Sequence, residues 1–503
     1  MGDRRRRSGG CSAPQGGGRF GGGQRCAHRG SAARTGGLVT GLLLRDAAVD
    51  GARVDVRVAG TAVAEMGPAL ARAPGEAVLD ARGGALLPGL CDHHLHLHAL
   101  AAHHRSVPCG PPEVANRAEL AEVLARARPD EHGWIRAVGY HESVAGPLDG
   151  AALDRLHSAR PVRVQHRSGA LWVVNRAAAR TLGLAAGDCP GIERDDAGRP
   201  TGRLWRADGW LRERLAPSGP PDLAEIGTRL ARLGITSVTD ATPDLDATAI
   251  RAITDAMGAC SLPQRVRLLG VPLGHRVPAG PRTGPHKIVL ADSGLPPFVE
   301  LTERIRAAHG AGRSVAVHCV TRTALVLLLA AFAETGTRSG DRVEHAALVP
   351  AELVPRIAEL GLRVVTQPGF LAHRGDDYLR EVPGDEHPDL YRMRSLIGAG
   401  VQVAASSDAP YGPHDPWRVI AAAVRRRTPA GRIAGPAERV DAGRALAGYL
   451  SAPDDPGGPV RRIRTGTPAD LVLLRGPLAE ALATPSADLV RATVIGGRLV
   501  SGS

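Results

Sequence analysis

Short apolar runs rich in Val, Leu and Ile alternate with longer amphipathic stretches through the middle of the chain. The runs have the length of buried strands, and intervening segments such as 301–312 and 352–361 have helical spacing. Repeated strand–helix units are typical of a parallel sheet, and eight of them favour a closed barrel. We therefore expect an α/β protein built on a (β/α)8, TIM-like barrel. The expected strands are 85–97, 235–241, 265–271, 286–292, 314–319, 342–346, 363–368 and 401–408.

Both ends of the patterned region contain short β-segments joined by tight turns. One such turn is expected at Asp50–Gly51, and a hairpin turn is expected at Gly496–Gly497. Because similar segments lie at both ends of a long α/β region, we predict one discontinuous small β-sandwich built from both termini. The expected domains are the β-sandwich from 38–84 and 461–503, the barrel at 85–460, and an insertion at about 100–230 after the first barrel strand.

The first 37 residues differ from the rest in composition. They hold eight Arg and one Asp among many Gly, so they supply a large part of the net charge of +12. A run of basic residues such as Arg4–Arg7 can contact nucleic acid. A segment with so few apolar residues has nothing to bury, however, and we predict that 1–37 is a disordered tail or sequence upstream of the true start. We expect no nucleic-acid partner.

The remaining composition restricts the class of protein. Apolar residues make up 43% of the chain, which allows a large core, but no run of eighteen apolar residues could cross a membrane. The basic N-terminus lacks the apolar segment of a secretory signal. Seven cysteines without framework spacing are expected to be free thiols. These observations predict a cytoplasmic protein with no membrane partner, and they leave open whether it forms a homo-oligomer.

Polar residues that can bind a metal recur where the expected strands end. His94 and His96 are two positions apart, so on a strand both imidazoles point to the same face. Each candidate alone has a structural explanation; an acid that ends a strand, for example, often caps a helix. Their order along successive strands points to a divalent metal site instead, because functional residues of such barrels lie at the carboxyl ends of strands. The further candidates are Lys287, His318, Glu344, His345 and Asp408.

Lys287 is the only lysine in the chain, and every other cationic side chain of this kind is an arginine. A guanidinium, whose pKa lies above about 12, cannot replace an amine that must lose its proton. Coding bias could have spared one lysine by chance. Its place at the end of the fourth expected strand favours a chemical requirement for an amine.

The motifs PGLCDHHLHL (88–97), VAVHC, VEHA, TQPGF and ASSDAPYG resemble those of the amidohydrolase superfamily, and the similarity is greatest to its family 3 branch. The resemblance runs from about residue 42 to the C-terminus. It implies a catalytic metal centre with one or two divalent ions per chain, Zn2+ first among them. Under this resemblance, the metal ligands would be His94, His96, His318, His345, Asp408 and a carboxylated, bridging Lys287.

Some positions depart from the family pattern on what the resemblance implies is the substrate side. His141 stands where an acid is usual, Ala170 stands where a histidine is usual, and Thr321–Arg322 replaces a Gly-Asp pair. We expect His141 and Arg322, together with Gln367 of the TQPGF motif, to contact a small-molecule substrate.

The expected reaction is hydrolysis of a non-peptide C–N bond, in an amide, formamide or related group, by metal-activated hydroxide. Asp408 would act as general base and then as general acid, and Lys287 would complete the centre. Two other classes remain. A mononuclear deaminase of a small heterocyclic or amidine-like substrate would not need Lys287, and a non-catalytic barrel scaffold would be expected to have lost ligands.

Overall fold

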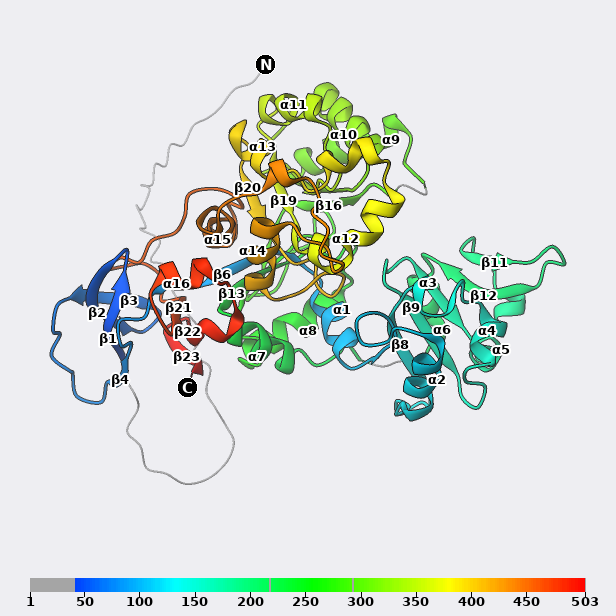
Figure 1. The fold of residues 1–503 in the computed structure, drawn as a ribbon, viewed down its shortest axis with the longest axis horizontal. Coiled ribbons are helices and arrows are strands. Elements are labelled where there is room, and N and C mark those ends of the chain that lie inside the picture. Colours follow the sequence, from blue (N-terminus) through cyan, green and yellow to red (C-terminus); the bar gives the residue numbers. More distant parts are fainter. Residues whose placement is uncertain (1–40, 217–218, 292–293, 503) are drawn as a thin grey trace, which may run out of the picture. The chain divides into compact units, whose positions relative to one another are not determined.

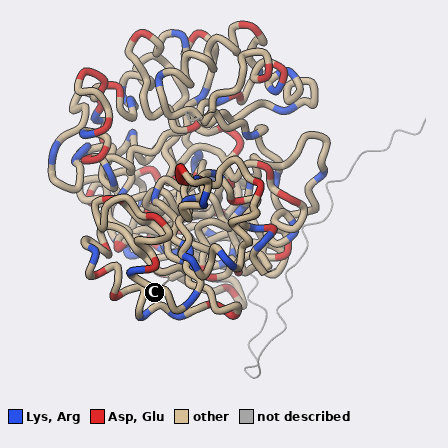
Figure 2. Tube along the Cα trace, turned by 90° about the vertical axis from the view of Figure 1, so that its right-hand side faces the viewer, with Lys and Arg blue, Asp and Glu red and all other residues tan. Residues whose placement is uncertain are grey.

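The computed structural model describes residues 41–216, 219–291 and 294–502 (Figure 1). The predicted tail at 1–37 lies outside the described residues. The fold is of mixed α/β class. Figure 2 shows that acidic and basic residues are interspersed along the described chain.

The middle of the chain forms two parallel sheets. Their strand orders are β15-β14-β13-β6 and β16-β17-β18-β19-β20, and every pairing within them is parallel. The strands of the first sheet are β6 (Leu90–Leu95), β13 (Ile235–Asp240), β14 (Arg265–Leu268) and β15 (Arg282–Thr283). Those of the second are β16 (His286–Val289), β17 (Val315–Cys319), β18 (Arg342–His345), β19 (Arg363–Thr366) and β20 (Val403–Ala405).

Backbone hydrogen bonds also join the edges of these two sheets. On one side, the Asp408 N–H donates to the His94 carbonyl at 2.8 Å and the His96 N–H donates to the Ala409 carbonyl at 2.8 Å. On the other side, the Lys287 N–H donates to the Leu269 carbonyl at 3.2 Å. The end of β6 is therefore held against the loop after β20, and β16 is held beside the end of β14.

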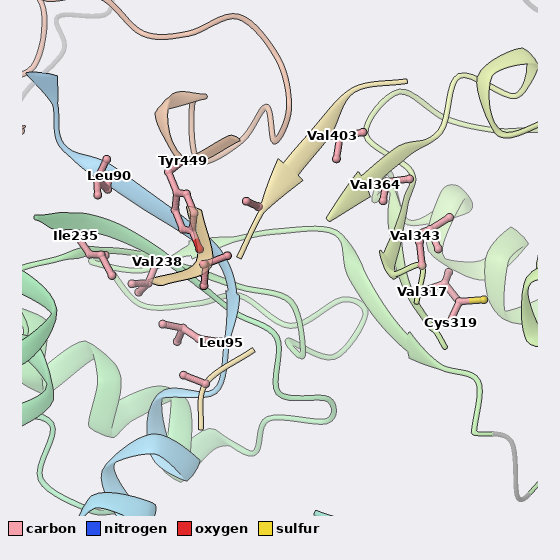
Figure 3. Packing of buried hydrophobic residues seen from close by; sticks show 14 of the residues in the cluster. Leu90, Leu95, Ile235, Val238, Val317, Cys319, Val343, Val364, Val403 and Tyr449 are labelled. Carbon is pink, nitrogen blue, oxygen red and sulfur yellow. The ribbon is translucent and has the colours of Figure 1, made fainter. Parts of the chain in front are cut away.

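Helices alternate with the parallel strands, and buried side chains from both belong to the same core. Side chains such as Leu90, Val238, Val343 and Val364 form one buried cluster, part of which is shown in Figure 3. Fully burying each such side chain stabilises the fold by about 1.5–3 kcal/mol. The helices are α1 (Leu97–His104), α7 (Ala224–Arg232), α8 (Ala247–Gly258), α9 (Phe298–Gly310), α10 (Arg322–Thr335), α11 (Val354–Glu359), α12 (Gly369–Glu381), α13 (Arg394–Gly398), α14 (Pro416–Arg425), α15 (Ala442–Leu450) and α16 (Leu478–Ala483).

The segment predicted as one strand at 85–97 is divided at Gly89. The three residues before it form β5 (Leu86–Pro88), which pairs with β21 (Leu471–Leu474), whereas β6 joins the parallel sheet. A Cβ on Gly89 would lie 2.1 Å from Cγ2 of Thr236 on β13. Only a glycine therefore allows the chain to pass from one sheet to the other at this close approach.

Segments from both ends of the described chain form two further four-stranded sheets. Leu44, Val56, Leu471 and Val494 belong to one buried cluster that both sheets share. The Ala469 N–H donates to the Thr61 carbonyl at 2.9 Å, which joins the blue and red regions of Figure 1. The first sheet, in the order β3-β2-β1-β4, consists of β1 (Gly41–Val49), β2 (Ala52–Ala59), β3 (Ala62–Gly67) and β4 (Ala77–Asp80). The second has the order β23-β22-β21-β5, with β22 (Val490–Ile495) and β23 (Arg498–Gly502).

The stretch between α1 and α7 forms a mixed six-stranded sheet with its own buried clusters. The strand order is β11-β12-β10-β9-β8-β7. The elements are β7 (Val107–Pro108), α2 (Arg117–Arg126), β8 (Ile135–Tyr140), α3 (Glu142–Ala145), α4 (Gly150–Asp154), β9 (Val162–His166), β10 (Leu171–Val174), α5 (Arg176–Thr181), β11 (Ile192–Arg194), β12 (Pro200–Trp205) and α6 (Asp208–Arg214).

Two findings concern the predictions drawn from composition. No helix in the part of the chain that the structure describes is long and apolar enough to cross a membrane. The prediction that all cysteines are free thiols is wrong, because Cys260 is disulfide-bonded. The cysteines found free are Cys91, Cys109, Cys189 and Cys319.

Candidate metal centre

The two parallel sheets carry a cluster of histidines at the carboxyl ends of their strands. His94 lies near the end of β6, His318 near the end of β17, and His345 ends β18. The ring centroids of His318 and His345 are 4.3 Å apart, and those of His94 and His345 are 4.7 Å apart. His96, just beyond β6, has its ring centroid 5.5 Å from that of His94. Parallel strands end at one edge, so residues far apart in sequence meet there.

Asp408 joins this cluster from the loop after β20. Its backbone has a φ of 54°, in the left-handed region that a non-glycine residue rarely adopts. The hydrogen bond to the His94 carbonyl holds the loop in this conformation. Oδ1 of Asp408 then lies 3.1 Å from Nε2 of His96 and 3.5 Å from Nε2 of His94. These three side chains place their ligand atoms within 4.8 Å of one another. The spacing is suitable for a divalent cation.

Three of the histidines have an oxygen atom beside Nδ1. His94 Nδ1 contacts the carboxylate of Glu344. His96 Nδ1 is 3.1 Å from Oγ1 of Thr242, and His345 Nδ1 is 2.9 Å from Oε1 of Gln367. A Nδ1–H that donates to an oxygen leaves the lone pair on Nε2, which is the arrangement typical of metal-binding histidines.

The Nε2 atoms of His94 and His345 are buried and have no hydrogen-bond partner among the described residues. An unsatisfied buried polar atom costs free energy unless a ligand or water occupies the space beside it. Burial is the main reason that the pKa values of both imidazoles lie well below their ordinary value. Burial also lowers the pKa of His318 to about 3. These imidazoles are therefore neutral near pH 7, as metal ligands must be.

Lys287, on β16, is also buried against this cluster, with an exposed fraction of 4%. Its Nζ has no hydrogen-bond partner in the ranges that the structure describes. Burial lowers the pKa of the amine, and the nearby carboxylates of Glu344 and Asp408 act in the opposite direction. An amine with a lowered pKa is more readily neutral, and the neutral form is the one that reacts with CO2.

Two buried carboxylates support the candidate ligand side chains. Glu344 accepts a hydrogen bond from Nε of Arg342 at 2.5 Å and contacts His94 with its other oxygen. Asp92 Oδ1 accepts from the N–H of His94 at 3.1 Å and from that of Ser407 at 3.2 Å. Burial raises the pKa of Asp92 to about 6. Glu344 thus orients an imidazole, and Asp92 ties β6 to the loop that carries Asp408.

The residues predicted to contact substrate lie in three different settings. Gln367 is buried; its Oε1 lies 2.9 Å from Nδ1 of His345, and its Nε2 donates to Oγ of Ser406 at 2.9 Å. Arg322 is exposed and pairs with Glu352 at 2.9 Å. His141 caps α3 through its contact with Ser143. The structure gives no contact between Arg322 or His141 and the histidine cluster, and their binding role stays a prediction.

Thr242 and Arg342 were not among the candidates predicted from the sequence, and Glu344 was predicted only as a possible metal-binding residue. The sequence positions of all three nevertheless indicate a supporting place beside the cluster. Arg342 and Glu344 are two apart on β18 and therefore share a face, where two buried opposite charges are expected to pair. Thr242 lies two residues beyond the end of β13, at the same edge as the histidines.

Comparisons with known proteins agree with this geometry. The model of the amidohydrolase family matches residues 77–501. An N-substituted formamide deformylase from Arthrobacter pascens is 27% identical over 473 residues, which cover 80% of this chain and 86% of that protein.

Two solved structures share the fold. An uncharacterized metal-dependent hydrolase from Pyrococcus horikoshii OT3 aligns with a TM-score of 0.70 and 20% identity, over 91% of this chain and 99% of that one. Atrazine chlorohydrolase TrzN from Arthrobacter aurescens TC1, complexed with zinc, aligns with a TM-score of 0.54 and 15% identity, over 92% of this chain and 95% of that one. Since a family model spans most of the chain and its motifs end the strands that carry the cluster, the chain belongs to the amidohydrolase family.

Proposed function

We propose that this chain is a metal-dependent hydrolase that cleaves a non-peptide C–N bond in a small molecule, with a formamide or another simple amide as substrate. The observation that carries the proposal is the convergence of unpartnered Nε2 atoms, the Asp408 carboxylate and a buried amine at one sheet edge. The similarity to a protein named N-substituted formamide deformylase supports the choice of formamides.

The proposed ligands are neutral imidazoles, a carboxylate and a modified lysine. This set of nitrogen and oxygen donors suits Zn2+, and the zinc in the structure of TrzN supports that choice. CO2 would add to the neutral Nζ of Lys287, forming an N–C bond and releasing one proton. The resulting carbamate is an anion that can bridge two cations. The proposed metal-binding residues are His94, His96, His318, His345, Asp408 and Lys287.

A divalent cation bound there would lower the pKa of a water molecule and so supply the nucleophile near neutral pH. Asp408 would accept the proton released by that water and pass it to the departing nitrogen, because its carboxylate lies beside both His94 and His96. Glu344, Thr242 and Gln367 would hold the imidazoles in orientation through their Nδ1 contacts.

We further propose that the two parallel sheets close into a (β/α)8 barrel around this centre. The backbone hydrogen bonds at both edges, from Lys287 to Leu269 and from Asp408 to His94, support closure. The buried cluster shared by the two terminal sheets supports a composite β-sandwich built from the expected ranges 38–84 and 461–503, with β5 (Leu86–Pro88) added to its second sheet.

A mononuclear deaminase is a second candidate, because His94, His96 and Asp408 alone form a compact three-ligand group. Such an enzyme has no use for a buried amine without a hydrogen-bond partner, so Lys287 favours the amidohydrolase with a lysine-bridged centre.

The proposal is tested by assaying the purified, metal-loaded protein on N-formyl, N-acyl and ring-amidine compounds, with and without a chelator. We expect chelator-sensitive release of formate or another carboxylic acid together with an amine. Release of ammonia from ring amidines alone would favour the deaminase. The absence of turnover together with an absence of metal binding would contradict both candidates.

A further inference from the structure

Arg374 lies on α12, the helix that follows β19 and therefore starts at the same sheet edge as the histidine cluster. At Arg374 the helix is kinked, with a non-helical φ of −145° and ψ of 25°. The guanidinium carbon lies 4.1 Å from the centroid of the Phe370 ring. The kink and the aromatic ring hold the plane of this cation in a defined position.

The hydrogen bonding of Arg374 is incomplete. Its Nε donates to the hydroxyl of Tyr378 at 3.0 Å, and that hydroxyl lies 2.8 Å from the hydroxyl of Tyr391. Across residues 41–216, 219–291 and 294–502, no carboxylate forms an ion pair with Arg374 and no protein group accepts from its two terminal nitrogens. The nearby carboxylate of Asp377 is already paired with Arg167 and Arg380.

Contacts place this cation close to the proposed reaction centre. Phe370, which lies under the guanidinium, packs against Gly412, where an added Cβ would be 3.1 Å from Cε1 of the ring. The Gly412 N–H in turn donates to the Asp408 carbonyl at 3.3 Å. Burial lowers the pKa of Arg374, but the surrounding phenols and the carboxylate of Asp408 outweigh it and raise the pKa overall. The side chain is therefore a permanent cation, linked to Asp408 through two intervening residues, Phe370 and Gly412.

We propose that Arg374 binds an anionic group of the substrate, specifically a carboxylate, so that the substrate is an N-formyl or N-acyl amine that also carries an acid. This inference rests on the proposed function and specifies its substrate class. With Nε committed to Tyr378, the two terminal nitrogens present a planar pair of donors, which matches the two oxygens of a carboxylate. A partly buried cation that lacks a protein counter-charge gains most from such a ligand.

The test compares N-formylglycine with N-ethylformamide, an uncharged formamide in which a methyl group takes the place of the carboxylate. We expect the metal-loaded protein to hydrolyse N-formylglycine with the higher kcat/KM. Arg374→Gln should lower kcat/KM for N-formylglycine by about ten- to a hundredfold, mainly through KM, and should leave that for N-ethylformamide within about twofold. Arg374→Lys should recover part of the loss because it restores the charge without the planar pair of donors. The matched control is Arg380→Gln on the same helix, which is exposed and paired and should alter neither substrate.

A measurement of substrate binding tests this inference independently of the proposed function. If neither formamide is hydrolysed, calorimetric titration of N-formylglycine into the metal-loaded protein and its Arg374→Gln and Arg374→Lys variants still decides the role of Arg374. Weaker binding to the glutamine variant, partly restored by lysine, would support the inference. Equal binding to all three proteins, or an equal loss of activity on both formamides in the Arg374 variants, would overturn it.

Discussion

Glu344→Gln is the substitution for which the structure gives the largest and most specific effect. The Glu344 side chain has an exposed fraction of 0%, and its two oxygens contact Nε of Arg342 and Nδ1 of His94. Glutamine has nearly the same shape, but it is neutral and keeps only one acceptor oxygen. One of the two donors is then left facing an amide N–H, and the buried Arg342 loses its counter-charge. Removing one partner of a buried ion pair costs about 3–5 kcal/mol in the free energy of unfolding.

The same substitution should weaken metal binding, because His94 loses the carboxylate that fixes its tautomer. We expect the metal affinity to fall by about ten- to a hundredfold. Stability is measured by urea unfolding of the metal-depleted protein, and affinity is measured by competition with a chromophoric chelator. The matched control is Glu352→Gln, whose exposed pair with Arg322 should contribute no more than about 1 kcal/mol. If Glu344→Gln behaves like this control in both assays, the proposed support of His94 is refuted.

Three further predictions concern the fold. Gly89→Val should destabilise the protein by about 1–3 kcal/mol in urea unfolding, because its Cβ would collide with Thr236; an unchanged midpoint would contradict the close approach. Burial lowers the pKa of His103 to about 4. Between pH 6.5 and 4 the unfolded chain therefore binds more protons than the folded protein. As the pH is lowered through this range, the free energy of unfolding should decrease by up to about 1.4 kcal/mol per pH unit, and His103→Gln should make this decrease smaller. Deletion from Ala469 onward should uncover the terminal apolar cluster and cause aggregation, and a monodisperse truncated protein would contradict the shared sandwich.

The alternation of strands and helices was visible in the sequence because buried parallel strands are short and almost wholly apolar. Polar residues such as His318 and Asp408 stand out against that background, so the sheet edge that carries them could be predicted. The division at Gly89 could not, because the reason for it is the proximity of Thr236, which lies 147 positions away in the sequence.

The positions of the candidate substrate-side residues could be predicted from the sequence less closely than those of the candidate metal ligands. Departures from a family motif draw attention to a position such as Arg322, but they do not show where its side chain points, and Arg322 pairs with Glu352 at the surface. Gln367 is buried, and its amide oxygen contacts the imidazole of His345. Arg374 belongs to none of the motifs found in the sequence. Its lack of a paired carboxylate could not be predicted, because it depends on which residues surround it in the folded protein.

The most direct test of the proposed centre is the metal content of Lys287→Arg beside that of the unaltered protein, measured by mass spectrometry of the metals after equilibration with Zn2+. Arginine preserves the charge and approximate length of Lys287, but it cannot add CO2 and form a bridging carbamate. We predict two ions per chain in the unaltered protein, one or none in Lys287→Arg, and a loss of activity by orders of magnitude. Retention of two ions by Lys287→Arg would contradict the lysine-bridged centre.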